Sequence, residues 1–304
     1  MGFAISGVWS AAATPLDTAF NPDAAKLAAH AQRLLAAGCD GVAVLGTTGE
    51  ANSFTSVERK LLLEGLLKAG LAADRLAPGV GVAALDETAE LTRHALSLGV
   101  TRVVMLPPFY YTNVSDDGLF AAYARIIDAV GDDRLRVVLY NFPQMSAVPL
   151  SVDLVARLIA AFPGVVAGIK DSSGKLESAQ GYVGLDPDFA VMIGSDPLLL
   201  QMLPAGAAGC ITALSNLRAG DLREVYDGWN DPARADEVAA AQGRLEAWRA
   251  LTLAYGAQLP TIKAMLAAKD GDDAWNRLVP PLVSLPAAQR ADLTTKLSEM
   301  GETI

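Results

Sequence analysis

Histidine and cysteine are scarce in this chain of 304 residues, which contains only two of each. Metal sites draw heavily on these two residue types, and His30 and His94 both fall in stretches with a helical pattern. We therefore expect no metal site, no metal-assisted chemistry and no cofactor. Two cysteines, Cys39 and Cys210, cannot build a disulfide framework, so a reducing, cytoplasmic compartment is expected.

Positively charged residues are outnumbered by negatively charged ones, and long apolar runs are absent from the sequence. Lys and Arg together number 24 against 34 Asp and Glu, and the net charge of −10 argues against nucleic acid as a partner. No run approaches the roughly 18 apolar residues of a membrane span, so no membrane partner is expected. The chain is nevertheless 52% apolar, which is enough to bury a large core as one barrel or as two ordinary domains.

Strand-like and helix-like segments alternate through the first two thirds of the chain. The pattern predicts eight strands, near residues 6–14, 41–46, 77–82, 102–107, 136–142, 165–170, 190–194 and 209–213. Helical patterns lie between them, including residues 23–37, 56–71, 88–98, 117–130 and 152–162. After about residue 216 only helical patterns remain. We therefore expect a (β/α)8 TIM barrel over residues 1–218 and a helical C-terminal extension over residues 219–304.

The alternative fold is an open, Rossmann-type sheet. That fold would require a G-x-G-x-x-G turn after an early strand. The nearest match is Gly79-Val80-Gly81, which lacks the third glycine. The amino-acid composition also shows no change along the chain that would mark a second domain, so the barrel remains the favoured architecture.

One lysine, Lys170, lies in an unusual place, at the end of the apolar run 165–169. Such a run with β-branched residues is typical of a buried strand. Burial disfavours the charged form of an amine, and a neutral amine is a nucleophile that forms a Schiff base with a carbonyl compound. The alternative is a structural cation whose amine extends to the rim of the sheet.

Other chemically useful residues also follow predicted strands, where the active sites of such barrels lie. The turn 46–50, Gly-Thr-Thr-Gly-Glu, offers N–H groups and hydroxyls that could hold a carboxylate, although an ordinary turn would have a similar composition. Tyr140 ends the fifth strand and is either a proton shuttle beside an imine or a core tyrosine. Candidate substrate contacts at the seventh and eighth strands are Asp196, Ile211 and Thr212.

Three of these segments form a set of motifs in one order and spacing: G-T-T-G-E at 46–50, Y-N-x-P at 140–143 and G-I-K-D at 168–171. Together they resemble the dihydrodipicolinate synthase/N-acetylneuraminate lyase family of Schiff-base aldolases. The resemblance runs from Gly7 to about Asn216 and, more loosely, into the helical tail. It implies the barrel fold and a substrate that contains a keto group.

The resemblance also implies a role for each residue. Lys170 would form an imine with the keto group of pyruvate or another 2-oxo acid, and Tyr140, hydrogen-bonded to Thr47, would relay protons. Thr47 and Thr48 would hold the substrate carboxylate. Tyr110 matches the tyrosine that neighbouring subunits of this family lend each other, which implies a homo-oligomer, either a dimer or a dimer of dimers.

Two positions depart from the family's pattern. Dihydrodipicolinate synthases carry an arginine two residues after the proline of Y-N-x-P, where it holds a carboxylate, and this chain has Met145 there. Sialic acid lyases carry an acidic residue after the aspartate of the seventh strand, whereas Asp196 is followed by Pro197. Both activities are therefore disfavoured. Met145, Phe142 and Phe109 instead indicate an apolar distal pocket.

We therefore expect a pyruvate-dependent class I aldolase, a carbon–carbon lyase that reversibly cleaves a 2-oxo acid to pyruvate and an aldehyde. The expected substrate is a 2-keto-3-deoxy sugar acid or an aryl analogue. A phosphorylated substrate is not expected, because no Lys or Arg lies near the ends of the seventh and eighth strands. The alternatives are 4-hydroxy-tetrahydrodipicolinate synthase (dihydrodipicolinate synthase), a keto-deoxy sugar acid dehydratase, and a non-enzymatic sensor of 2-oxo acids.

Overall fold

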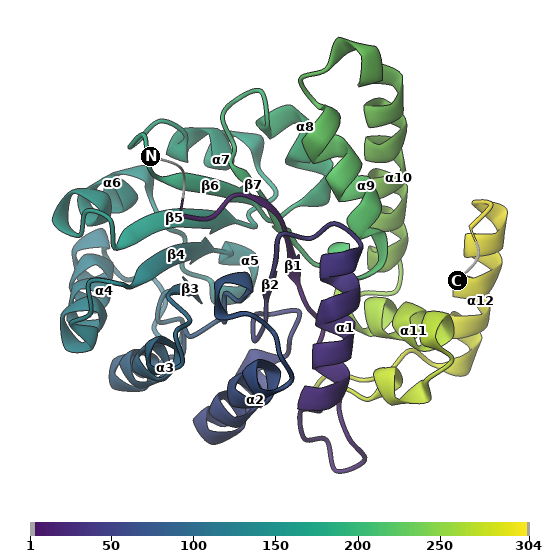
Figure 1. The fold of residues 1–304 in the computed structure, drawn as a ribbon, viewed down its shortest axis with the longest axis horizontal. Helices are drawn as coiled ribbons and strands as arrows, with labels where there is room; N and C mark the ends of the chain where they lie inside the picture. The colour runs from purple at the N-terminus through teal and green to yellow at the C-terminus, as the bar shows by residue number, and fades with distance from the viewer. Residues whose placement is uncertain (1–3, 303–304) are drawn as a thin grey trace.

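A curved sheet of seven parallel strands forms the centre of the protein (Figure 1). The computed structural model describes residues 4–302. The strands are β1 (Gly7–Ala11), β2 (Gly41–Ala43), β3 (Arg102–Met105), β4 (Arg136–Asn141), β5 (Val166–Asp171), β6 (Ala190–Ile193) and β7 (Gly209–Thr212). Their order in the sheet is β2-β1-β7-β6-β5-β4-β3, so the first and last strands along the chain pair with each other, and β2 and β3 are the two edges of the sheet.

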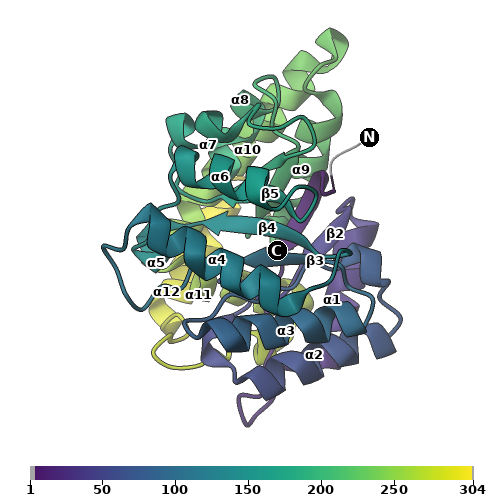
Figure 2. The ribbon, with the colours of Figure 1, turned by 90° about the vertical axis from the view of Figure 1, so that its left-hand side faces the viewer.

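Helices cover the outside of this sheet, as expected for the alternating pattern. They are α1 (Ala24–Ala36), α2 (Ser56–Lys68), α3 (Leu85–Ser97), α4 (Asp116–Val130), α5 (Pro143–Ser146), α6 (Val152–Ala161), α7 (Leu176–Tyr182), α8 (Leu199–Met202) and α9 (Ser215–Gly228). Figure 2 shows α2, α3 and α4 side by side along the outer face. The architecture is a nearly closed TIM barrel, which confirms the predicted fold class.

The segment that was predicted as a strand at residues 77–82 forms no regular strand, and this detail of the prediction is wrong. Pro78 has no N–H to donate to a ladder. The segment still joins β2 to β3, because Gly79 N donates to Val44 O at 2.8 Å and Val104 N donates to Pro78 O at 2.9 Å. These bonds connect the two edges of the sheet and complete the barrel.

Side chains alternate between the inside of the barrel and the helix layer, as the two-residue period of a strand requires. In β4, Val138 and Tyr140 belong to the inner cluster, whereas Val137 and Leu139 pack toward the helices. Tyr140 pairs in register with Lys170 of β5. The same period therefore places the phenol and the amine together at the carboxyl ends of two neighbouring strands.

The predicted helix ends agree closely with the observed ones. Thr55 caps α2 in a full capping box with Glu58, which satisfies backbone N–H groups that the helix leaves free. Gly38 and Gly131 follow α1 and α4 with φ of 105° and 60°, a region in which glycine carries no Cβ penalty. These caps set where each helix ends and the chain turns back toward the sheet.

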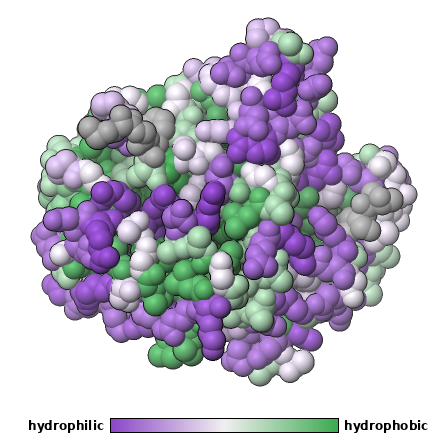
Figure 3. Space-filling model, in the orientation of Figure 1, coloured by the Kyte–Doolittle hydropathy of each residue, from purple (hydrophilic) through white to green (hydrophobic). Residues whose placement is uncertain are grey.

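Three further helices form the C-terminal extension: α10 (Ala235–Leu253), α11 (Gln258–Asp270) and α12 (Ala287–Glu299). The expected boundary between residues 218 and 219 falls inside α9, at the kink where Arg218 has φ −128° and ψ 38°. Because α9 packs on β1, we propose it as the last helix of the barrel. On the face in Figure 3, hydrophilic residues gather over the region of α9 and α10.

Candidate active site

A cavity of about 310 Å³ opens at the carboxyl ends of the strands and extends under the C-terminal extension. Seven residues singled out from the sequence line it: Thr47, Thr48, Tyr140, Phe142, Met145, Lys170 and Ile211. They come from the loop after β2, from β4 and the turn that follows it, from β5 and from β7. Residues far apart in the chain are thus brought together around one space, at the place where barrel enzymes carry their chemistry.

Lys170 and Tyr140 are in direct contact inside this cavity. The Lys170 side chain is buried, and its Nζ lies 4.3 Å from the centroid of the Tyr140 ring. The Tyr140 hydroxyl lies 3.5 Å from Thr47 Oγ1, a separation typical of catalytic hydrogen bonds before substrate tightens them. The structure therefore gathers an amine, a phenol and a second hydroxyl in one cavity.

The backbone around Lys170 is held by a polar cluster on the other side of the strand. Asp171 is buried and accepts hydrogen bonds from Asn141 Nδ2 at 2.8 Å and from Ser173 Oγ at 2.9 Å. Asn141 in turn accepts from Leu150 N at 3.1 Å. These bonds fasten the ends of β4 and β5 to each other, so the positions of Tyr140 and Lys170 depend on them.

The turn after β2 offers free donors to the cavity. Its N–H groups at Gly49 and Glu50 bond within the turn. In the part of the chain that the structure describes, the N–H groups of Thr47 and Thr48 donate to no protein acceptor. Two adjacent unpaired N–H groups and two hydroxyls are donors suited to an anionic oxygen, and the carboxylate of a 2-oxo acid stays their predicted ligand.

The conformation of this turn depends on the C-terminal extension. Leu45 and Glu50 are non-glycine residues with φ of 57° and 55°, a conformation that carries an energetic cost for residues with a Cβ. Glu50 is fixed by a fully buried ion pair with Lys263 of α11, in which Nζ lies 2.5 Å from Oε1. Its other carboxylate oxygen accepts from Val279 N at 2.9 Å. Contacts from the last third of the chain thus hold the turn.

The three remaining candidates lie elsewhere. Asp196, in the short turn Asp196–Leu198, is fully buried and does not line the cavity. Thr212 is also fully buried, and its neighbour Ile211 takes the inward position in β7. Tyr110 is 76% exposed and stacks edge to face on Tyr111 with ring centroids 5.3 Å apart. The structure thus does not bring Asp196 and Thr212 to the cavity, and the role of Tyr110 in the site of a neighbouring subunit stays a prediction.

Asp196 instead faces the extension. Its side chain lies 3.4 Å from Nη1 of Arg249, and its carbonyl accepts from Gln242 Nε2 at 3.2 Å. Burial raises the pKa of Asp196, and the nearby Arg249 guanidinium opposes that effect. The aspartate therefore positions Arg249, a residue that does reach the cavity.

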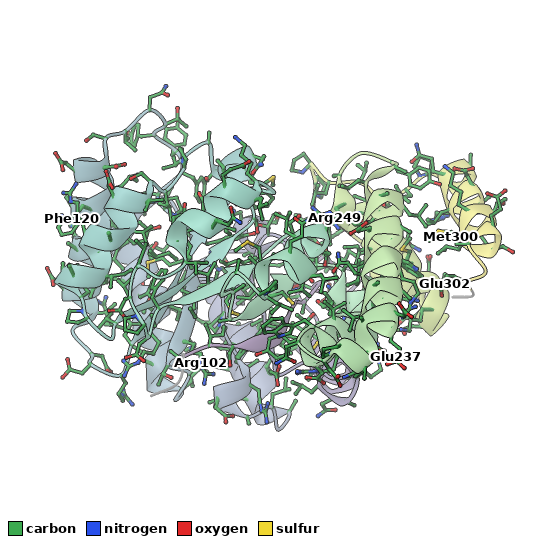
Figure 4. All side chains as sticks on the ribbon, turned by 90° about the horizontal axis from the view of Figure 1, so that it is seen from above. Arg102, Phe120, Glu237, Arg249, Met300 and Glu302 are labelled. Carbon is green, nitrogen blue, oxygen red and sulfur yellow. The ribbon has the colours of Figure 1, made fainter. Side chains whose placement is uncertain are left out.

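Arg249 is the main feature of the site that was not predicted from the sequence. It lies in α10, whereas the prediction considered cations only at the ends of the strands. A signal was present in α10, where Val238, Gln242, Leu245, Arg249 and Thr252 recur at helical spacing along one face. Three polar side chains in a stripe that also contains Val238 and Leu245 indicate a buried polar partner or a cavity. Figure 4 shows Arg249 on the side of α10 that faces the barrel.

The described residues contain neither a cluster suited to a metal ion nor a helix suited to span a membrane. Across residues 4–302, no group of three or more His, Cys, Asp and Glu side chains is arranged to hold a metal ion. In the same range, no helix is both long and apolar enough to cross a membrane. The expectations of no metal, no cofactor and no nucleic acid stay predictions from the sequence.

Comparison with known proteins identifies the family. Residues 4–300 match the Dihydrodipicolinate synthetase family. A protein from Chloroflexus aurantiacus, named as an uncharacterized DapA-like lyase, is 36% identical over 261 residues, which cover 86% of this chain and 85% of the relative. This chain therefore belongs to the dihydrodipicolinate synthetase family, and it is a lyase of the aldolase type.

Two solved structures resemble the whole chain. Dihydrodipicolinate synthase from Agrobacterium tumefaciens is 32% identical with a TM-score of 0.86, covering 97% of this chain and 99% of its own. YagE, a prophage protein of the dihydrodipicolinic acid synthase family from E. coli K12, solved in complex with pyruvate, is 25% identical with a TM-score of 0.89. That match covers 98% of this chain and 99% of YagE. The likeness thus includes the C-terminal extension as well as the barrel.

Proposed function

We propose that this enzyme uses Lys170 to form a Schiff base with a 2-oxo acid and reversibly cleaves that acid to pyruvate and an aldehyde. The observation that carries the proposal is the contact between the buried Lys170 amine and the Tyr140 ring inside the cavity, 4.3 Å from Nζ to centroid. The free N–H groups of Thr47 and Thr48 would hold the carboxylate that every 2-oxo acid presents beside its keto group.

The reaction balances with these residues alone. The Lys170 amine adds to the C2 carbonyl, and loss of water gives a protonated imine. When the C3–C4 bond breaks, its electron pair moves into the enamine and the C4 hydroxyl loses its proton, which releases the aldehyde. Protonation of C3 and hydrolysis of the imine then yield pyruvate and the free amine. Tyr140, with Thr47 behind it, would carry the proton in each step.

The proposed substrate is a 2-keto-3-deoxy sugar acid or a related 2-oxo acid with a distal tail. Support comes from Met145, which lines the cavity and is 62% exposed where synthases carry an arginine. Phe142, Ile211 and Leu259 add apolar surface to the same space. YagE, the E. coli relative, is described in complex with pyruvate, the product that such cleavage would release.

Synthase activity is the second candidate, because a Bacillus subtilis relative that is 30% identical over 295 residues is named 4-hydroxy-tetrahydrodipicolinate synthase. The missing guanidinium at Met145 weighs against it. We expect negligible condensation of pyruvate with aspartate semialdehyde. Robust synthase activity of the purified protein would instead make it the main function. A dehydratase would release water and no aldehyde, and a sensor would turn over nothing.

Borohydride trapping with pyruvate tests the proposal. The wild type should gain a stable mass that maps to Lys170. Lys170→Ala should abolish the adduct, and so should Lys170→Arg, because a guanidinium stays protonated. Lys175→Ala is the matched control, since Lys175 lies five residues away at the start of α7. Trapping that persists without Lys170, or that maps to Lys175, would refute the assignment.

A further inference from the structure

The residues that line the cavity carry positive charge. Among the residues that line it, Lys170 and Arg249 are cations, and none of those described is Asp or Glu. The chain as a whole carries a net charge of −10, so two cations without a lining anion set this space apart from the rest of the molecule. Asp196, which lies behind Arg249 and outside the lining, offsets part of this charge. The lining itself still presents only cations, which attract anionic groups.

The two cations cannot both serve one carboxylate. A protonated imine keeps the charge of Lys170 beside the C2 carbon, and the carboxylate next to that carbon would lie on the N–H groups of Thr47 and Thr48. Arg249 comes from α10, a different part of the chain from the turn after β2. Its guanidinium therefore remains available for a second group on the substrate.

The contacts of Arg249 leave donors free. Only Nη1 bonds within the described chain, to Gln258 Oε1 at 2.9 Å and to Asp196 Oδ2 at 3.4 Å. These bonds fix the plane of the guanidinium, whereas Nε and Nη2 have no acceptor among the described residues. Two neighbouring N–H groups in a fixed plane match the geometry of a carboxylate.

The apolar residues around Arg249 would strengthen a contact between its guanidinium and a carboxylate. Leu253, Leu259 and Ile262 line the cavity beside Arg249. Apolar walls exclude water, which strengthens the attraction between a guanidinium and a carboxylate. When a neutral tail is bound, the same walls would leave Nε and Nη2 of Arg249 without an acceptor, and a site built for a polar group rejects analogues that lack it.

We propose that Arg249 binds a second carboxylate at the far end of the substrate, so that the preferred 2-oxo acid is a dicarboxylate and its aldehyde half is an aldehyde acid. This inference rests on the proposed function, because it assumes that the 2-oxo group reacts at Lys170. It narrows the substrate class from sugar acids in general to those that end in a carboxylate.

Matched substrate pairs test the inference. 4-Hydroxy-2-oxoglutarate differs from 4-hydroxy-2-oxopentanoate by a carboxylate in place of a methyl group, and 2-keto-3-deoxyglucarate differs from 2-keto-3-deoxygluconate at its last carbon. Pyruvate release, coupled to lactate dehydrogenase, gives kcat/KM for each. For at least one pair, the wild type should prefer the diacid by roughly 10- to 100-fold, the usual worth of a hydrogen bond to a charged group.

Variants then assign the preference to Arg249. Arg249→Gln should reduce the diacid preference by roughly the same 10- to 100-fold, mostly through KM, and Arg249→Lys should retain part of it. Arg244→Gln removes a cation from the same helix, where it pairs with Asp221 outside the cavity, and should leave the preference unchanged. Thermal melting of each variant checks that it is folded.

The outcomes separate the two proposals. Failure of the wild type to trap pyruvate would overturn the proposed function. Normal trapping with equal kcat/KM for both members of each pair, or a preference that survives in Arg249→Gln, would overturn the dicarboxylate inference alone. Should Arg249→Gln not fold, the wild-type pairs and Arg249→Lys, which keeps a cation beside Asp196, still decide the question.

Discussion

At the scale of single residues, we propose that the Tyr140 hydroxyl contributes chemistry and that its ring contributes packing. Tyr140→Phe keeps the buried ring beside Lys170 and removes the group that lies 3.5 Å from Thr47 Oγ1. Turnover should therefore fall by about 10²- to 10⁴-fold, while the melting temperature changes little. Steady-state kinetics alongside trapping with pyruvate is the measurement. Unchanged turnover would make Tyr140 a core tyrosine only.

His30 gives the protein a specific sensitivity to acid. Burial lowers its pKa to about 4 from 6.5, and Nε2 pairs with Asn216 Oδ1 at 3.0 Å. Between these values the unfolded chain binds a proton that the folded chain does not, so stability falls as pH falls from 6.5 to about 4. Above 6.5 the imidazole is neutral in both states, and this contribution to stability is fully present.

Substituting His30 should therefore flatten that part of the pH profile. His30→Gln retains a donor for Asn216 and cannot take up a proton. Urea unfolding at about pH 7 and about pH 5 should show a smaller loss of stability in His30→Gln than in the wild type. His94→Gln is the control, because it removes the other histidine, on the outer helix α3. An identical loss in wild type and His30→Gln would contradict the prediction.

Most of the residues that the sequence predicted for the site line the cavity, because their motifs lie at strand ends, where neighbouring strands bring them together. It did less well for Asp196 and Thr212, since which face a side chain occupies at the end of a short strand depends on one residue of register. Ile211 faces inward, so Thr212 faces the helix layer. No local pattern at Gly209–Thr212 distinguishes these two possibilities.

At the scale of elements, the ion pair between Lys263 and Glu50 joins α11 to the turn after β2. Lys263→Ala should lower the free energy of unfolding by about 3–5 kcal/mol, because it leaves a buried carboxylate without its partner. It should also weaken substrate binding, since Glu50 holds the turn that presents Thr47 and Thr48. Chemical denaturation and KM measure the two effects.

A double variant separates the effect of an unpaired buried charge from the effect of lost side-chain volume. Lys263→Met together with Glu50→Gln removes both charges and keeps similar volumes, so much of the lost stability should return. Lys269→Ala, in the last turn of the same helix and away from this pair, is the matched control and should cost little. A stable Lys263→Ala protein with normal KM would show that the turn holds its shape without α11.

The sequence located most elements to within a few residues, and its failures have local causes. Pro78 prevents a regular strand between β2 and β3, although hydrogen bonds on either side still close the barrel. The wall that α10 and α11 add to the cavity was not foreseen, because helical periodicity tells which face is buried but not what that face covers.

At the scale of the whole molecule, the exposed aromatic loop indicates assembly. Tyr110 and Tyr111 are each 76% exposed and Val114 is 41% exposed, and exposed aromatic clusters of this kind are enriched at interfaces. We propose a dimer in which Tyr110 completes the site of the neighbouring subunit. Tyr110→Phe should lower turnover and leave the mass in solution unchanged.

Charge in the same loop should separate the subunits. Tyr111→Asp should lower both the mass measured by light scattering and the turnover number. Leu61→Asp, at an exposed position of α2, places the same charge on a different surface and serves as the comparison. A wild type that is monomeric and fully active at assay concentration would rule out a shared site.

The residues that line the cavity come from two separate parts of the chain, which has a consequence for how such enzymes diversify. Lys170 and Tyr140, the proposed reacting groups, are encoded before residue 171, whereas the wall from Arg249 to Leu282 is encoded after the last barrel helix. A genetic crossover near Gly228 would exchange the wall and leave the amine in place. Provided that the pairing between positions 50 and 263 is kept, descendants could acquire new substrates by recombination while inheriting the same bond-breaking step.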